Sequence, residues 1–273
     1  MTEQTFEPDA FTDIGVTLHD HVATVEIQRP PHNFFDHSLI CQIADAFDAL
    51  DAEADCRAII LASTGKAFCA GANFGTGQED GSGSDDFTEE GFQNTTGKLY
   101  QEATRLFRNR KPIIGAIQGA AIGGGLGLSL VPDFRVASPA ARFGANFVKL
   151  GLHQGFGISV TLPRLIGQQA AQELLLTGRR VSGSEALTLG LVDQLVDADD
   201  LRNAAMELAL SIAENAPLAV MSVRATLRAG LADAVREATS HELAEQQWLR
   251  ATDDAYEGIK AVAERRPGHF TGR

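Results

Sequence analysis

The sequence predicts an α/β fold followed by a helical C-terminal part. Short apolar runs alternate with turns and helical patterns up to about residue 137, an order typical of parallel strand pairing. The last seventy or so residues show helical periodicity and no strand pattern. With 273 residues, 44% hydrophobic and 22% charged, the chain can bury a large core without disulfides or metals. We expect a core over residues 1–200 and a helical region over 201–273.

The N-terminal segment predicts a hairpin, a helix and a buried strand. Residues 14–28 alternate apolar and polar positions on either side of a turn at 19–21. A helical pattern with one apolar face covers 36–50. The apolar run over 57–62 is typical of a buried strand.

The following segment predicts a loop and then a second strand–turn–helix unit. Residues 75–86 are rich in Gly, Ser and acidic residues, so we expect a mobile loop. A helix is predicted over 88–108 and a strand over 112–118, followed by a glycine turn and a short helix that ends at Leu130. Another strand is predicted over 134–137.

The stretch from Pro112 to Val131 carries no charge and is long enough to span a bilayer. It contains six glycines and a glutamine and is bounded by prolines at 112 and 132. This composition favours a strand, a tight turn and a buried helix over a membrane span.

Charge and cysteine content narrow the possible partners. The net charge is −13 and the pI about 4.9, which argues against binding nucleic acid or an anionic membrane. The three cysteines have no disulfide or metal-ligand spacing, so we expect a reducing, cytoplasmic setting and no metal site. The polar, acidic N-terminus does not look like a secretory signal.

Four glycines lie among the five residues 123–127, just before the predicted short helix. Neither the dinucleotide pattern G-x-G-x-x-G nor the Walker pattern, with its Lys-Ser/Thr pair, is complete here. The first N–H groups of a helix have no intrahelical partner, so glycines here would let a ligand approach them. Relief of steric crowding in a tight turn explains the glycines equally well.

A second small-residue turn follows the strand over 57–62. It reads Gly-Lys-Ala-Phe-Cys-Ala-Gly-Ala-Asn over residues 65–73 and also exposes backbone donors. Two such turns can supply the two halves of an oxyanion hole, which stabilises a developing negative charge on oxygen.

These segments together resemble the crotonase superfamily, also called the enoyl-CoA hydratase/isomerase family, over nearly the whole chain. Six segments in family order carry the resemblance: Arg29 to Asn33, Gly65 to Asn73, Gln118 to Gly125, Asp133 to Ala137, Arg142 to Gly144, and Leu176 to Gly178 with Ala186 and Gly190 to Val192.

The resemblance implies a crotonase-like spiral of repeated β-β-α turns with a C-terminal helical trimerisation region, in a homotrimer or a dimer of trimers. It also implies a coenzyme A thioester as substrate, with no permanently bound cofactor, and a role of the kind found in fatty acid metabolism. By residue-for-residue match, the oxyanion hole falls on the N–H groups of Ala72 and Gly124. Coenzyme A is implied to lie along the first turn, against Lys66, Ala70, Ala72, Asn73 and Phe74.

The sequence departs from the family where hydratases carry their acid–base groups. The two glutamate positions are Gly127 and Phe147, and the site of an aspartate in some relatives is Gly155. None of these side chains transfers a proton, so addition of water by two glutamates is not expected. Phe147 is instead expected to line an apolar acyl pocket, with packing in the core as the open alternative.

Other polar groups are candidates for the missing chemistry. His153 and Gln154 lie on the loop that faces the substrate in the family; histidine is a general base near neutral pH, and glutamine holds a water or a carboxylate. Shaping of the loop is an equally open role for His153. The alternatives to a hydratase or isomerase are therefore a thioester hydrolase, a C–C cleaving enzyme or a decarboxylase that uses these residues, and a non-catalytic CoA-binding protein.

Overall fold

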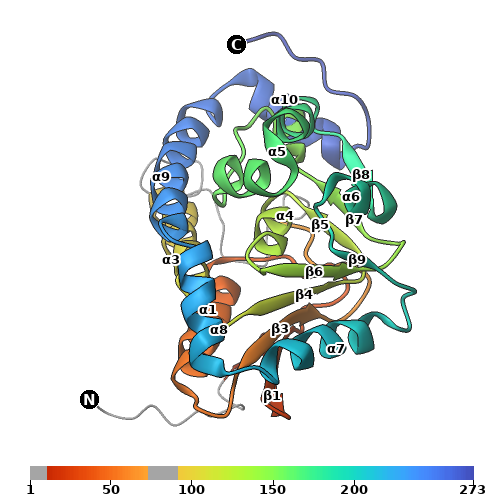
Figure 1. Cartoon of the computed structure of the whole chain (residues 1–273). Coiled ribbons are helices and arrows are strands. Elements are labelled where there is room, and N and C mark those ends of the chain that lie inside the picture. Colours follow the sequence, from red (N-terminus) through yellow and green to blue (C-terminus); the bar gives the residue numbers. More distant parts are fainter. Residues whose placement is uncertain (1–10, 73–91) are drawn as a thin grey trace.

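The computed structural model describes residues 11–72 and 92–273, which form two β-sheets with helices packed around them (Figure 1). The larger sheet has six strands in the order β1-β2-β3-β4-β6-β9, and the smaller sheet has the order β5-β7-β8. The alternation of strands and helices and the helical C-terminal part confirm the predicted fold class.

The larger sheet begins with the predicted hairpin. Strands β1 (Ile14–His19) and β2 (Val22–Ile27) pair antiparallel. Asp20 and His21 between them have φ values of 50° and 68°, the left-handed backbone that a tight two-residue hairpin turn requires.

The remaining strands of this sheet all pair parallel, as the strand–turn–helix order predicts. They are β3 (Ala58–Ser63), β4 (Ile113–Ile117), β6 (Phe134–Ala137) and β9 (Gln194–Leu195). Parallel strands buried on both faces read as continuous apolar runs, which is why β3 and β4 were recognisable in the sequence.

Helices cover both faces of the larger sheet. On one face lie α1 (His37–Ala52), which begins at the side-chain cap Asp36, and α3 (Lys98–Leu106), which continues a π-helical segment, η3 (Gln93–Gly97). On the other face, α7 (Leu201–Ala213) packs its alanines against β3, β4 and β6. The start of the predicted helix over 88–108 and the predicted loop over 75–86 lie outside the described residues.

The smaller sheet contains strands that the sequence did not predict, because each is only three residues long. They are β5 (Ala120–Ile122), β7 (Arg142–Gly144) and β8 (Arg180–Ser182). Four helical segments connect or flank them: α4 (Gly124–Ser129), the 3-10 segment η4 (Asn146–Leu150), α5 (Ile158–Thr177) and α6 (Gly183–Leu189). The uncharged stretch 112–131 is thus a strand, a turn and a buried helix, as expected.

The C-terminal part consists of α8 (Pro217–Leu227), α9 (Leu231–Leu249) and α10 (Asp253–Ala263). Helix α9 runs past α3 and α5, as Figure 1 shows. Since α7 packs on the sheet, the division at residues 200 and 201 stays a prediction about sequence regions. Within the described residues no single helix meets the length and hydropathy needed to cross a membrane; α7 and α8 meet it only as a pair bent by 105°.

Candidate functional site

The two small-residue turns predicted from the sequence lie against each other. The first turn bonds to β5: the Cys69 N–H donates to the Ala120 carbonyl at 3.0 Å, and the Ile122 N–H donates to the Cys69 carbonyl at 3.1 Å. These bonds make a parallel bridge between Cys69 and Ala121. Backbone hydrogen bonds therefore fix the position of the segment that leads to Ala72 relative to the segment that leads to Gly124.

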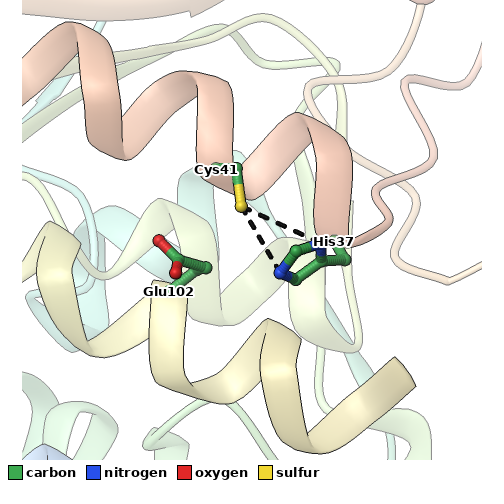
Figure 2. A group of neighbouring side chains, drawn as sticks. All are labelled: His37, Cys41 and Glu102. Atoms are coloured by element: carbon green, nitrogen blue, oxygen red, sulfur yellow. Dashed lines mark hydrogen bonds between the residues drawn. The ribbon is translucent and has the colours of Figure 1, made fainter. Parts of the chain in front are cut away.

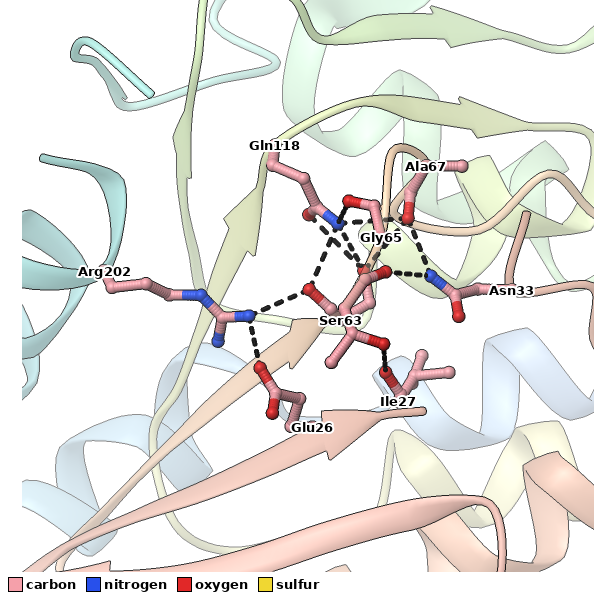
Figure 3. A network of polar contacts seen from close by, with 9 residues as sticks. Glu26, Ile27, Asn33, Ser63, Gly65, Ala67, Gln118 and Arg202 are labelled. Carbon is pink, nitrogen blue, oxygen red and sulfur yellow. Dashed lines mark hydrogen bonds and ion pairs between the residues drawn. The ribbon is translucent and has the colours of Figure 1, made fainter. Parts of the chain in front are cut away.

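A network of side-chain amides holds the first turn from behind (Figure 3). The buried Asn33 donates through Nδ2 to the carbonyls of Thr64 and Ala67, at 2.6 and 2.8 Å. Gln118, just before β5, donates through Nε2 to the Ala67 carbonyl at 3.0 Å and to the Ser63 Oγ at 2.9 Å. Since these carbonyls are bound from one side, the N–H groups of the turn are held in fixed orientations.

The second turn begins at Gly123, whose φ of 59° and ψ of −125° suit glycine alone. Its N–H donates to the Gly144 carbonyl at 2.8 Å, which ties the turn to β7. The next residue, Gly124, is the first of α4, so its N–H has no intrahelical acceptor, and no described residue accepts from it.

The first and second turns approach each other at Gly71. A Cβ placed on Gly71 would lie 3.6 Å from the Gly124 nitrogen and 2.6 Å from the Ile122 carbonyl oxygen. Ala72 follows Gly71 directly and is exposed. The backbone that carries the Ala72 N–H therefore reaches the neighbourhood of the Gly124 N–H.

The glycines of the second turn are also required by close packing. A Cβ on Gly124 would lie 2.1 Å from the Phe35 ring, and one on Gly125 would lie 2.0 Å from the Cys69 carbonyl oxygen. Such approaches are closer than any non-bonded contact, so larger residues are excluded. Crowding and donor access, the two explanations left open by the sequence, thus apply together.

Aromatic side chains fill the space beside two of the positions at which the resemblance implies a carboxylate in relatives, Gly127 and Gly155. A Cβ on Gly127 would lie 2.7 Å from Cβ and Cδ1 of Phe156, and one on Gly155 would lie 1.7 Å from the Tyr100 hydroxyl. The Phe35 and Phe156 rings lie 5.7 Å apart beside α4. An acidic side chain fits at neither glycine without rearrangement of this packing.

Phe147 and Cys69 lie near or in the turns. The ring tip of Phe147 is 3.8 Å from where a Cβ on Gly123 would be, so this side chain lies beside the second turn. Cys69 is fully buried, and burial raises the pKa of its thiol to about 12, which leaves it un-ionised and unreactive near neutral pH.

The other predicted coenzyme A contacts are placed as follows. Lys66 is exposed, and its carbonyl oxygen would lie 1.9 Å from a Cβ on Gly119. Ala70 is half-buried, and its N–H donates to the His32 carbonyl at 3.0 Å. Asn73 and Phe74 lie outside the described residues.

The contacts of the His153 and Gln154 side chains are with their own loop, Ser159 and α9. The His153 Nδ1 is 2.8 Å from the Gln154 carbonyl oxygen, and its ring meets the edge of His241 on α9 at 5.8 Å. The Gln154 amide donates to the Ser159 Oγ at 2.9 Å. Both residues line a cavity of about 620 Å³ between η4, α5 and the C-terminal helices, whose lining includes neither Ala72 nor Gly124.

Three residues that the sequence did not single out hold the loop of His153. The buried Glu242 accepts from the Gly157 and Ser159 N–H groups at 2.7 and 3.0 Å, and burial raises the pKa of its carboxyl. The Tyr100 hydroxyl donates to Gln246 at 3.1 Å, and Gln246 donates to the His153 carbonyl at 2.9 Å. These contacts bridge segments 83 to 146 residues apart, so no local sequence pattern predicts them.

A mostly parallel sheet and a small second sheet, with a turn after β3 that pairs with β5 and faces a second small-residue turn, are the features of the crotonase fold. The family model for enoyl-CoA hydratase/isomerase matches residues 17–273. The chain belongs to the enoyl-CoA hydratase/isomerase family, and this membership supports a function related to acyl-CoA.

Individual relatives agree with this assignment. The chain is similar to the enoyl-CoA hydratase EchA19 of Mycobacterium tuberculosis, with 32% identity over 269 residues that cover 97% of each protein. Among solved structures, it resembles an enoyl-CoA hydratase/isomerase from Pseudoalteromonas atlantica, with a TM-score of 0.82, 27% identity, and coverage of 95% of this chain and 100% of the other. An enoyl-CoA hydratase from Bacillus anthracis matches with a TM-score of 0.74, 31% identity, and coverage of 96% and 100%.

Proposed function

We propose that this protein is an enzyme that binds an acyl-CoA thioester and stabilises enolate-like charge on its carbonyl oxygen. The N–H groups of Ala72 and Gly124 donate to that oxygen. The observation that carries the proposal is the backbone pairing of the two turns, which places the Gly124 nitrogen 3.6 Å from where a Cβ on Gly71 would lie. Family membership supplies the substrate class.

Two fixed donors suit this chemistry. A thioester carbonyl gains negative charge as its α-carbon loses a proton or a carbon substituent, and N–H groups aimed at the oxygen stabilise that charge. Because the turns are already held by β5, β7 and the Asn33 and Gln118 amides, little reorganisation accompanies the reaction.

The acyl group is proposed to lie against an aromatic wall. Phe35 contacts Gly124, Phe156 contacts Gly127, and Phe147 lies beside Gly123, so the surroundings of the turn are apolar. An apolar wall lowers the local dielectric and strengthens the hydrogen bonds to the oxyanion. Coenzyme A is proposed to run along the first turn beside Lys66 and Ala70.

We propose that the reaction is not hydration by two glutamates. Gly127, Phe147 and Gly155 carry no acid or base, and the packing of Phe156 and Tyr100 leaves no space for one at the two glycines. Isomerisation, which moves one proton between C2 and C4 of the acyl chain through the enolate and adds no water, is the proposed class. The base that carries this proton is then a group outside these three positions.

A second candidate function uses His153 and Gln154 in thioester hydrolysis, C–C cleavage or decarboxylation. The observation that favours it is the 620 Å³ cavity that both side chains line. For this function the acyl group must extend from the turns to that cavity. The third candidate function is that of a protein that binds coenzyme A without catalysis.

An assay with enoyl-, β-keto- and malonyl-CoA thioesters separates these functions. Turnover of any of them that the Ala72→Pro variant loses supports the proposed site, because proline removes the N–H. The protein is also mixed with crotonyl-CoA in water with no other reactant. If the absorbance of the conjugated enoyl thioester is lost, the protein catalyses hydration and the proposal against hydration is wrong. Tight acyl-CoA binding with no product from the whole set would favour the non-catalytic alternative.

A further inference from the structure

Outside the two turns, three side chains with metal-binding atoms meet between α1 and α3 (Figure 2). His37 and Cys41 lie one helical turn apart on α1, and Glu102 faces them from α3. The Cys41 Sγ is 3.4 Å from the His37 Nε2. One ligand atom from each of the three residues lies within 4.8 Å of the others.

These distances suit a tetrahedral zinc ion. Zinc lies about 2.3 Å from sulfur and about 2.0–2.1 Å from nitrogen, and at tetrahedral angles these bonds separate the two ligand atoms by about 3.5 Å. The observed 3.4 Å between sulfur and nitrogen matches that separation. A carboxylate oxygen of Glu102 lies within 4.8 Å of ligand atoms of both other residues, which places it to supply a third corner.

The donor set selects the class of metal. A thiolate and an imidazole favour zinc and similar borderline-soft ions, whereas magnesium and calcium prefer oxygen ligands only. A site with three protein ligands leaves one position for water.

The local charge also favours a cation. Arg105 is bound by Glu102, Asp45 and Asp48, so three carboxylates surround one guanidinium. Arg105 contacts the Oε2 atom of Glu102, which leaves its Oε1 atom for a metal. Glu102 belongs both to this group and to the cluster with His37 and Cys41, so the negative charge adjoins the cluster.

We propose that His37, Cys41 and Glu102 bind one zinc ion that links α1 to α3, with water as the fourth ligand. The site is separate from the oxyanion turns, since none of its residues belongs to them. Helix α1 begins two residues after Phe35, whose ring packs against Gly124, so the link would stabilise the wall behind the second turn.

Cobalt substitution tests the site directly. The metal-free protein, kept reduced without thiols, is titrated with Co²⁺ and then with Zn²⁺ in competition with a chromophoric chelator. The expected result is one Co²⁺ per chain, with the visible bands of a tetrahedral site and a thiolate-to-metal charge-transfer band. Zinc displaces both signals.

Matched variants decide which residues bind the metal. Cys41→Ser is expected to abolish the charge-transfer band, and Cys41→Ser or Glu102→Gln to weaken zinc binding by about 100-fold or more, because a ligand matters at least as much as its supporting contacts. Cys56→Ala, which removes a cysteine elsewhere, is expected to keep the signals. An unchanged spectrum in Cys41→Ser, or equal zinc affinity in the wild type and both ligand variants, would overturn the proposal.

A stability measurement covers variants that fold poorly. Zinc in excess is expected to raise the unfolding temperature of the wild type and of Cys56→Ala but not that of His37→Ala, since a ligand that binds only the folded state stabilises it. Equal shifts in all three proteins would contradict the site. Neither experiment uses an acyl-CoA, so their outcome is independent of the proposed enzymatic function.

Discussion

The paired turns at Gly71 and Gly124 contrast with the loop of His153 and Gln154. The turns present main-chain donors, and their neighbours fit so closely that glycine is required at Gly124 and Gly125. The loop presents side chains that have partners of their own: the His153 Nδ1 lies against the Gln154 carbonyl, and the Gln154 amide donates to Ser159. Gln246 of α9 donates to the His153 carbonyl. The first region is arranged to leave donors available, whereas the second has most of its polar groups engaged within the fold.

This contrast indicates a division of roles. Donors that lack a protein acceptor, as Gly124 does among the described residues, are available to a ligand. The His153 Nδ1 and the Gln154 amide already have partners, which suits residues that shape a loop. We therefore expect substitutions in the two regions to affect catalysis and stability differently.

The largest effect is expected at Ala72. Ala72→Pro removes one oxyanion donor and should lower kcat/KM by about 100- to 1,000-fold. Ala72→Ser keeps the N–H and serves as the matched control, with little change expected at this exposed position. Steady-state kinetics on the true substrate measures both. Equal activity of the two variants would show that the Ala72 N–H does not take part.

The next effect concerns the glycine beside Phe156. Gly127→Ala should lower the free energy of unfolding by about 1–3 kcal/mol, because the new methyl overlaps Cβ and the ring atom Cδ1 of Phe156. In a Phe156→Ala background the same substitution should cost less, with a coupling of about 0.5–3 kcal/mol. Denaturant unfolding of the four proteins gives this cycle. A vanishing coupling would mean that the ring does not occupy the vacant carboxylate position.

The buried Glu242 should make stability depend on pH. Burial raises the pKa of its carboxyl in the folded state, so the folded protein holds this proton more tightly than the unfolded chain. The contribution is fully present below the unfolded value, near 4.5, and is lost as pH rises through the folded pKa. Relative to Glu242→Gln, the wild type should therefore lose stability over this window, by about 1.4 kcal/mol for each tenfold gain in proton affinity on folding.

Chemical unfolding of both proteins at several pH values measures the difference. Asp233→Asn, at an exposed position on the same helix, is the control. A stability of the wild type relative to Glu242→Gln that rises with pH would contradict the raised pKa.

The smallest catalytic effect is expected at His153. If the turns carry the reaction, His153→Ala should change kcat by no more than about two- to threefold, the size expected of a residue outside the chemistry. The second candidate function predicts a loss of about 100- to 10,000-fold, since proton-transfer groups contribute that much. Turnover of the variant, with Gln154→Ala beside it, decides between the two.

The sequence predicted the parts of the fold that depend on local patterns. The hairpin turn, β3, β4, α1 and the apolar stretch 112–131 were all recognisable, because their apolar periods and turn residues lie within short windows. The strands of the smaller sheet were missed because three residues carry too little periodicity.

The candidate site likewise has features that a local sequence pattern predicts and features that only the tertiary structure reveals. The roles proposed for Ala72 and Gly124 followed from motifs whose glycines are needed for the main chain itself. The contacts of Glu242 with Gly157, and of Glu102 with Cys41 across α1 and α3, depend on tertiary packing and have no local signature. The packing of Phe156 against Gly127, in the space that a larger side chain at position 127 would need, was likewise visible only in the structure.

The most direct test of the oxyanion hole is the carbonyl stretching frequency of a bound thioester. Isotope-edited infrared difference spectra of carbonyl-labelled butyryl-CoA are recorded with wild type and with Ala72→Pro, with binding of each verified by calorimetry. Donation by the Ala72 and Gly124 N–H groups predicts a clear shift to lower frequency in the wild type and a smaller shift in the variant. A bound thioester whose band stays at its solution frequency in the wild type would contradict the account.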